Sequence, residues 1–409
     1  MQMAKRLNAR KTASANGAAE PRSSDQPVIT IHAGDKRTEA FKKTVTRDAP
    51  LARLAQEWSY ILRVRSRWVG DAGQRETFGL RALDDLKNLG IGPDDVQQFA
   101  KADRIEIELH DWRNEDTQAA SIHEAAAEVP WEYLISAATR AQGRFQSLLI
   151  SRLFRNGTPQ VTPSPPQNML FLESAPGRIG DQYEFDDEEE RIRAAVGATG
   201  RHEKKVFVLN TPQVSELRER LQKEKWEAIH VTGIDTHQAA FIIENFYDVF
   251  PKDSEIWKEI TKSSRVLCDG MILREGNESE CPVRYDKLAG ILVGRTPPRI
   301  VTLNLYHSGA RTARELVRRG AHVALGFLDE IDDELAERFF QAFYWAWCHP
   351  ADKALSIPDA FLDAWDKMSA SNLYGTSIVI WMGRSVFDSS GRRAGDRRSS
   401  IAKKRRGRR

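Results

Sequence analysis

Apolar runs of strand length alternate with stretches of helical period along most of the chain. The expected core strands lie near residues 168, 205, 227, 299, 321 and 377. Segments with apolar residues at helical spacing separate most of them, and a crossover through a helix is too long for a hairpin. Strands connected in this way lie parallel in one sheet that helices cover on both faces. The pattern therefore predicts an α/β fold with a central, mostly parallel sheet.

One strand-turn-helix junction organises this sheet. A mostly apolar strand at 299–305 runs into a tight turn at Ser308 and Gly309, and the helix that follows stops at Gly320. A second strand, 321–327, comes directly after that glycine. The carboxyl ends of parallel strands are where an α/β sheet presents its chemistry. We therefore expect the functional site beside this turn.

The same pattern divides the chain into four regions. Residues 1–27 lack hydrophobic periodicity and are expected to be disordered, as is a basic tail at 388–409. Residues 28–104 mix strand and helix signals and predict a small α/β N-terminal region. The main domain is expected at 105–387, and it begins with a strictly alternating stretch, 105–109, that predicts a half-exposed strand.

Composition excludes several classes of protein. Cys268, Cys281 and Cys348 form no CxxC pair and no metal-ligand spacing with the histidines, so we expect neither a disulfide scaffold, a metal site nor another cofactor. The chain contains no run of about 18 apolar residues and no secretory signal, so we expect no membrane segment and a cytoplasmic location.

Charge is distributed unevenly. Of the net charge of +3, residues 391–409 contribute +9, so the rest of the chain carries −6. The tail is free of aromatic residues, which suits phosphate neutralisation without base stacking, although a solubilising terminus is equally consistent. The candidate nucleic-acid or anion ligands are Arg397, Arg398, Lys403, Lys404, Arg405, Arg406, Arg408 and Arg409.

Six short motifs follow one another from residue 130 to residue 332. They are Pro130-Trp131-Glu132, His230-Val-Thr-Gly233, Asp269-Gly270, Leu303-Asn304 with Ser308-Gly309, Gly320-Ala321, and the acidic turn at Asp332 that opens a Phe-rich helix. In this order and spacing they resemble the CHAT domain, a caspase-like peptidase fold of the clan that includes caspases and separases. The resemblance covers about 105–387 and implies a caspase-like, mostly parallel sheet.

The resemblance does not extend to the catalytic dyad. Peptidases of the family share His-x-x-Gly-His, whose second His is the base, and Asn-Ala-Cys-x-Ser-Gly, whose Cys is the nucleophile. In this sequence those two positions hold Ile234 and Tyr306. Isoleucine cannot accept a proton, and a phenol with a pKa near 10 is a poor nucleophile at neutral pH. We therefore expect no catalytic residues and no peptidase activity.

Four other residues are candidates to rescue catalysis. His237 lies three residues past the lost base, Cys268 precedes Asp269, and His307 and Ser308 would place a serine beside a base. His237 alone has no nucleophile to activate. Cys268 is weakened as a candidate because free cysteines are usually buried. His307 and Ser308 are adjacent, and adjacent side chains on a turn point apart. These residues leave open a second hypothesis, an active CHAT-family endopeptidase with a non-standard nucleophile.

The first hypothesis is a pseudo-caspase that binds another protein, either a peptide segment or an effector or sensor subunit. The expected groove residues are His230, Gly233, Asp235, Asn304, Tyr306, His307 and Asp332. The resemblance implies a scaffold or regulator in bacterial signalling or anti-phage defence. A third hypothesis is a nucleic-acid-associated component that binds through the basic tail.

Overall fold

The structure is a computed structural model that describes residues 26–36, 38–110, 117–144, 147–159, 164–176, 185–197, 205–239, 269–276, 279–349, 355–368 and 377–389. Most of the expected disordered N-terminus and nearly all of the basic tail lie outside these residues. Pro27, Asp388 and Ser389, at the inner ends of those two regions, lie in regular structure.

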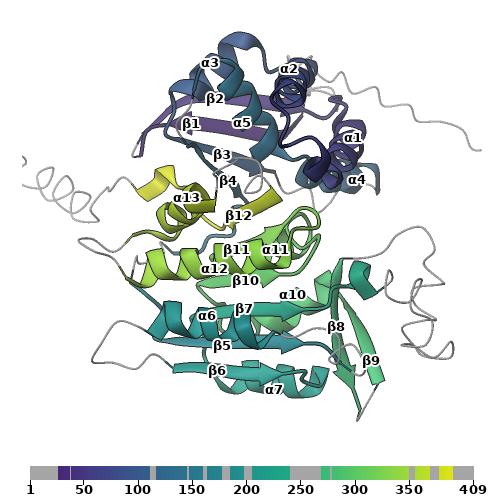
Figure 1. Cartoon of the computed structure of the whole chain (residues 1–409), viewed down its shortest axis with the longest axis vertical. Coiled ribbons are helices and arrows are strands. Elements are labelled where there is room, and N and C mark those ends of the chain that lie inside the picture. Colours follow the sequence, from purple (N-terminus) through teal and green to yellow (C-terminus); the bar gives the residue numbers. More distant parts are fainter. Residues whose placement is uncertain are drawn as a thin grey trace, which may run out of the picture.

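Among the described residues, ten strands form one sheet in the order β2-β1-β3-β4-β12-β11-β10-β7-β5-β6 (Figure 1). Their bounds are β1 Pro27–Gly34, β2 Glu39–Thr46, β3 Arg104–Leu109, β4 Leu149–Leu153, β5 Asn168–Ser174, β6 Lys205–Asn210, β7 Ala228–Gly233, β10 Ile300–Asn304, β11 Val323–Phe327 and β12 Ile378–Met382. A separate antiparallel hairpin consists of β8 (Gly270–Glu275) and β9 (Ser279–Arg284).

The predicted core of the sheet is confirmed. The six expected strands are β5, β6, β7, β10, β11 and β12, and they are neighbours in the sheet. β10 lies between β7 and β11 and is parallel to both, as the strand-turn-helix junction predicted. Only β12 among these six runs antiparallel to its neighbour β11.

Helices cover both faces of the sheet. Their bounds are α1 Leu51–Arg63, α2 Ala72–Asn88, α3 Pro93–Lys101, α4 Thr117–Glu128, α5 Trp131–Ala141, α6 Asp186–Gly197, α7 Val214–Lys223, α10 Tyr285–Val293, α11 Thr312–Arg318, α12 Asp333–Cys348 and α13 Ile357–Met368. Successive strand residues point to opposite faces, so Leu170 joins the apolar cluster of α7, α10 and α11, while Phe171 joins that of α6, α12 and α13. Both faces are buried, which explains the continuous apolar runs in the sequence.

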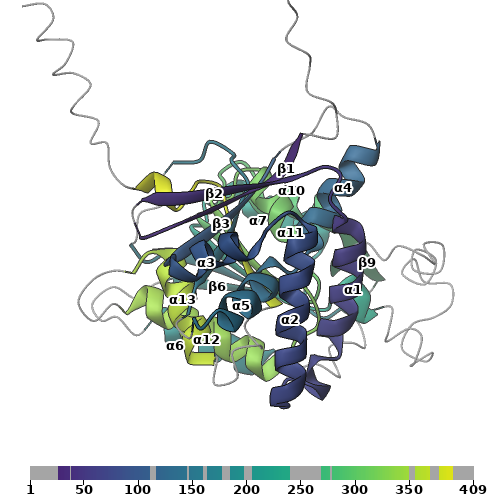
Figure 2. The ribbon, with the colours of Figure 1, turned by 90° about the horizontal axis from the view of Figure 1, so that it is seen from above.

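The N-terminal region continues the same sheet. β1 and β2 pair with each other and β1 pairs with β3, which connects through β4 to β12. Figure 2 shows helices α1, α2, α3 and α5 together on one side of β1, β2 and β3. The strand at 105–109 is therefore not half-exposed as its alternation suggested, because it lies inside the sheet and Glu106 has no exposed surface. β2 and β4 were not predicted from the sequence.

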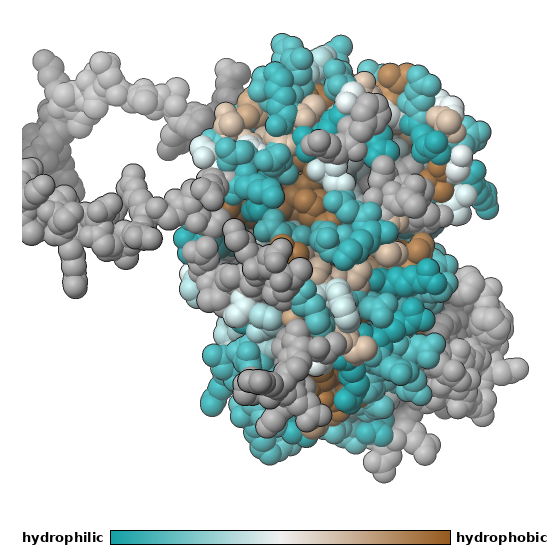
Figure 3. Space-filling view, turned by 60° about the vertical axis from the view of Figure 1, so that its left-hand side comes forward, coloured by the Kyte–Doolittle hydropathy of each residue, from teal (hydrophilic) through white to brown (hydrophobic). Residues whose placement is uncertain are grey.

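The surface seen in Figure 3 is mostly hydrophilic. Hydrophobic residues gather in a hollow between the upper and lower parts of the molecule and in smaller separate areas. Among the described residues, no helix is long and apolar enough to cross a membrane.

Candidate functional site

The turn after β10 is fixed by backbone contacts. His307 has a positive φ of 54°, and Gly309 donates its backbone N–H to Phe327 at 2.6 Å. The Ser308 hydroxyl donates to the Leu305 carbonyl at 2.7 Å and accepts the Phe327 N–H at 3.1 Å. Ser308 is 1% exposed. Its hydroxyl shapes the turn and is not available as a nucleophile.

The end of β7 places Ile234 in the core. Gly233 has a φ of 146°, and a Cβ at this position would lie 2.3 Å from the Ser174 carbonyl oxygen. This glycine therefore permits a close approach of two backbones. Ile234 is fully buried, donates its N–H to Ser174 at 3.0 Å and accepts the Ile272 N–H at 2.9 Å. The expected base position is occupied by a side chain that only packs.

Ile234 and Tyr306 line the same small cavity, of about 60 Å³, between α6 and α12. The Tyr306 hydroxyl donates to Asp333 Oδ1 at 2.8 Å. Burial raises the pKa of Tyr306 above its usual value near 10, and the Asp333 carboxylate raises it further. The described residues that line the cavity are Phe185, Glu188, Thr232, Gly233, Ile234, Gln238, Asn304, Tyr306, Asp333 and Glu337, and none of these has a thiol or an imidazole.

A buried polar network lies beneath this cavity. His230 Nε2 is 2.8 Å from Glu188 Oε1, and its Nδ1 is 2.7 Å from the Thr302 hydroxyl. The Asn304 amide donates to both Glu188 oxygens at 2.9 and 3.0 Å. We had expected His230 to face a groove. His230 has no exposed surface, so it supports the cavity instead. Asn304 remains half-buried and lines the cavity.

A larger cleft, of about 660 Å³, lies on the other side of His307. Helices α1 and α4 contribute residues to its lining, together with His237, Asp269 and Arg311. His237 Nε2 is 2.9 Å from Asp269 Oδ1, and Arg311 contacts both Asp269 oxygens at 3.4 Å and forms an ion pair with Glu128. The structure thus brings two of the rescue candidates, His237 and His307, to one cleft.

The two histidines differ in their electrostatic surroundings. Burial lowers the pKa of His237, but the Asp269 carboxylate outweighs burial, so the net pKa is raised. Burial and the neighbouring His237 lower the pKa of His307 to about 4, and its Nδ1 lies 3.2 Å from the Leu328 carbonyl oxygen. The two neighbouring imidazoles therefore lose their protons in separate pH ranges, His307 at lower pH than His237.

Two expected groove residues act as turn caps. Asp235 is fully buried, and its Oδ1 accepts the backbone N–H groups of His237 and Gln238. Burial raises the pKa of Asp235 to about 7. Asp332 is exposed and accepts the Leu335 N–H at 3.1 Å as the cap of α12. Asp235 therefore does not line a groove, which corrects the sequence-based assignment.

The remaining candidates fall outside the described residues. These are Cys268 and the tail residues Arg397 to Arg409. Within the described ranges, no group of three or more His, Cys, Asp or Glu side chains could hold a metal ion. Sequence reasoning missed the Asp269 partner of His237 and the wall formed by α1, because no local signal connects segments so far apart in the chain.

The chain was compared with protein families and known structures. The family model described as CHAT domain matches residues 126–391. The crystal structure of the Arg-specific cysteine proteinase gingipain R is similar with a TM-score of 0.35 and 10% identity, covering 58% of this chain and 55% of that one. The Saccharomyces cerevisiae separase–securin complex has a TM-score of 0.32 and 13% identity, covering 63% of this chain and 15% of that one. The chain thus spans about half of the gingipain chain and a much smaller part of the other. No curated protein sequence matches it.

Proposed function

The chain belongs to the CHAT domain family, and on that premise we propose that it is a catalytically inactive member that binds another protein at the carboxyl ends of its sheet strands. The observation that carries this proposal is the shared cavity of Ile234 and Tyr306. Both positions where the family places its dyad meet in one place, and neither side chain can perform the chemistry. The loss of catalytic chemistry therefore concerns both halves of the site.

Each of the two side chains has a structural role instead. Ile234 packs in the core, and Tyr306 donates its hydroxyl to Asp333. A phenol with a raised pKa does not ionise at neutral pH, and the described residues that line the cavity include no imidazole to assist it. A hollow of about 60 Å³ also leaves little room for a substrate side chain.

The adjacent cleft supports the protein-binding part of the proposal. Its volume of about 660 Å³ is in the range of ligand-binding clefts, and its lining is mixed polar and apolar. Tyr60 of α1 lines this cleft with 72% of its surface exposed. Tyrosine is enriched at the centres of protein interfaces because it combines a large apolar ring with a hydrogen-bonding hydroxyl. Family resemblance alone suggests the setting, bacterial signalling or anti-phage defence in the cytoplasm.

Peptidase activity is tested with the full-length protein and a broad peptide library. We expect no cleavage by the wild type. Cys268→Ala and His237→Ala variants serve as controls, because they remove the remaining candidate nucleophile and the candidate base that pairs with Asp269. A product that forms with the wild type and disappears with either variant would establish the alternative, an active endopeptidase with a non-standard nucleophile.

Partner binding is tested by site-specific photo-crosslinking in cells of the source organism. A crosslinking amino acid at Tyr60 probes the cleft, and the same amino acid at Leu80, which is 55% exposed on α2, is the matched control. We expect one protein to be captured at position 60 and not at position 80. Equal capture at both positions, or none at either, would contradict a partner site in the cleft.

A further inference from the structure

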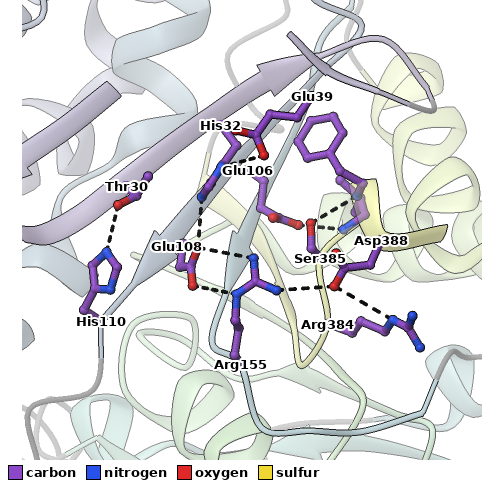
Figure 4. A network of polar contacts seen from close by, with 12 residues as sticks. Thr30, His32, Glu39, Glu106, Glu108, His110, Arg155, Arg384, Ser385 and Asp388 are labelled. Carbon is purple, nitrogen blue, oxygen red and sulfur yellow. Dashed lines mark hydrogen bonds and ion pairs between the residues drawn. The ribbon is translucent and has the colours of Figure 1, made fainter. Parts of the chain in front are cut away.

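A second polar cluster lies on β1, β2 and β3, outside the candidate site (Figure 4). His32 of β1 is 4% exposed and lies between two carboxylates from neighbouring strands. Its Nε2 hydrogen-bonds Glu108 Oε2 of β3 at 2.9 Å. Its Nδ1 lies 3.1 Å from Glu39 Oε2 of β2, an ion-pair contact that is not aligned as a hydrogen bond. One imidazole therefore connects three strands.

The cluster continues to the C-terminal segment of the described chain. Glu108 Oε1 accepts from Arg155 Nε at 2.7 Å, and Arg155 Nη1 lies 3.3 Å from Asp388 Oδ2. Glu106 of β3 accepts the Val386 backbone N–H at 2.7 Å. The imidazole is therefore one member of a network that also fixes the last described residues.

The contacts of His32 depend on its protonation state. An imidazolium donates from both ring nitrogens, whereas a neutral imidazole has one N–H and one lone pair. After deprotonation the N–H can remain on Glu108, and the lone pair then faces the Glu39 carboxylate. Attraction is replaced by repulsion at that contact. Glu106, directly opposite His32 in the β1–β3 register, adds a third acidic side chain to the same face.

β2 is the element that this change affects most. Among the described strands it is the last at one end of the sheet, and there it pairs only with β1. Its pairing has two register irregularities, and most of its residues are exposed or half-buried. Edge strands with few buried contacts open at low free energy. A single lost ion pair therefore has a larger effect on β2 than on a central strand.

We propose that His32 is a pH-sensitive latch that holds the edge strand β2 on the sheet while the imidazole is protonated and loosens β2 when the imidazole is neutral. The groups that face His32 or its partners come from every neighbouring element. They are Thr30 of β1, Glu39 and Lys42 of β2, Glu106 and Glu108 of β3, His110 after β3, Arg155 after β4, and Arg384, Ser385 and Asp388 after β12.

The direction of the pH dependence follows from the shifted pKa values. Burial lowers the pKa of His32, but Glu108 and Glu39 outweigh burial, so its pKa is raised above 6.5. The stabilisation is complete below pH 6.5 and is lost as pH rises through the raised value. Burial raises the pKa of Glu106, which acts in the same direction but begins near pH 4.5. The pKa of Glu108 is lowered to about 2, since bonds to His32 and Arg155 outweigh burial, so its contribution is lost only in acid.

Hydrogen–deuterium exchange of the full-length protein between pH 6 and pH 9 tests the latch. After correction for intrinsic exchange, the protection of β2 amides should fall by roughly tenfold for each unit by which contact with β2 raises the pKa of His32. His32→Gln should abolish the fall in β2. His110→Gln is the matched control, because His110 is on the same face but contacts Thr30 at 2.8 Å, and burial lowers its pKa.

A milder variant guards against misfolding of His32→Gln. Glu39→Gln, at the more exposed end of the contact, should remove most of the fall in β2 protection, since Glu108 lies on β3 and does not connect the imidazole to β2. Protection of β2 that does not vary with pH in the wild type would overturn the proposal. A transition that persists unchanged in both variants would do the same.

Discussion

The imidazole ring of His237 lies 4.4 Å, centroid to centroid, from that of His307 at an interplanar angle of 49°. The pKa of His237 is raised, because Asp269 outweighs its burial, and the pKa of His307 is lowered by burial and by the charge of His237. Groups whose surroundings separate their pKa values in this way are common at functional sites. The pair places two imidazoles with oppositely shifted pKa values in the larger cleft.

Replacing Asp269 with Asn should lower the pKa of His237. Burial would then act on the imidazole without the carboxylate that opposes it most. NMR titration of ring-labelled histidine measures the change. Asp329→Asn is the matched control, because Asp329 lines the same cleft but pairs with Arg65 at 2.7 Å. An unchanged His237 titration in the Asp269 variant would show that another group holds the proton.

Replacing Asp235 with Asn should stabilise the protein above pH 7 and not at pH 4. Burial raises the pKa of Asp235 from 3.8 to about 7, so the folded state binds the proton more tightly than the unfolded state. Stability is therefore lost as pH rises between these values, by up to roughly 4 kcal/mol at 1.36 kcal/mol per unit. Asn keeps an oxygen for the two backbone N–H groups. Urea unfolding at pH 4 and pH 8 measures the difference, and equal effects at both would contradict the assignment.

Removing the charge of Glu132 should destabilise the fold strongly. Glu132 binds Arg152 through two contacts at 2.8 and 2.7 Å, and both side chains are almost fully buried. Glu132→Gln leaves a buried guanidinium without its counterion, which typically costs about 3–5 kcal/mol. The control Glu334→Gln breaks an exposed pair with Arg338 and should have little effect. Urea midpoints compare the two, and similar losses would argue against a special role of the buried pair.

Deleting residues 391–409 should abolish any binding of nucleic acid, because the rest of the chain carries −6 and repels phosphate. If the full-length protein neutralises about six phosphates, log K should fall with log salt with a slope of about −5. Fluorescence titrations of labelled DNA and RNA at two salt concentrations test this. Unchanged binding after the deletion would place the contact elsewhere, and no binding by either protein would favour a solubilising tail or an acidic protein partner.

The sequence by itself determined the centre of the sheet. The apolar periods around β5, β7, β10 and β11 are local, and a helix between two strands leaves almost no choice but a parallel crossover. The sequence also shows that Ile234 and Tyr306 stand at the two positions that the family resemblance assigns to the dyad. Reading a residue type at a motif position needs no tertiary contact. The shared cavity of these two residues follows from the parallel pairing of β7 and β10, whose ends meet at one edge.

The tertiary structure alone decided where the polar residues of the interior belong. β4 contains Arg152 and was not predicted as a strand, because its burial requires Glu132 of α5 and the carbonyl oxygens of Ala127 and Val129. The burial of Glu106 likewise depends on a distant segment, because its Oε2 accepts the backbone N–H of Val386, 280 residues away. A sequence period reports which residues share a face of one element. It carries no information about which distant segment supplies the opposite charge, and a buried polar side chain is stable only when that segment is in place.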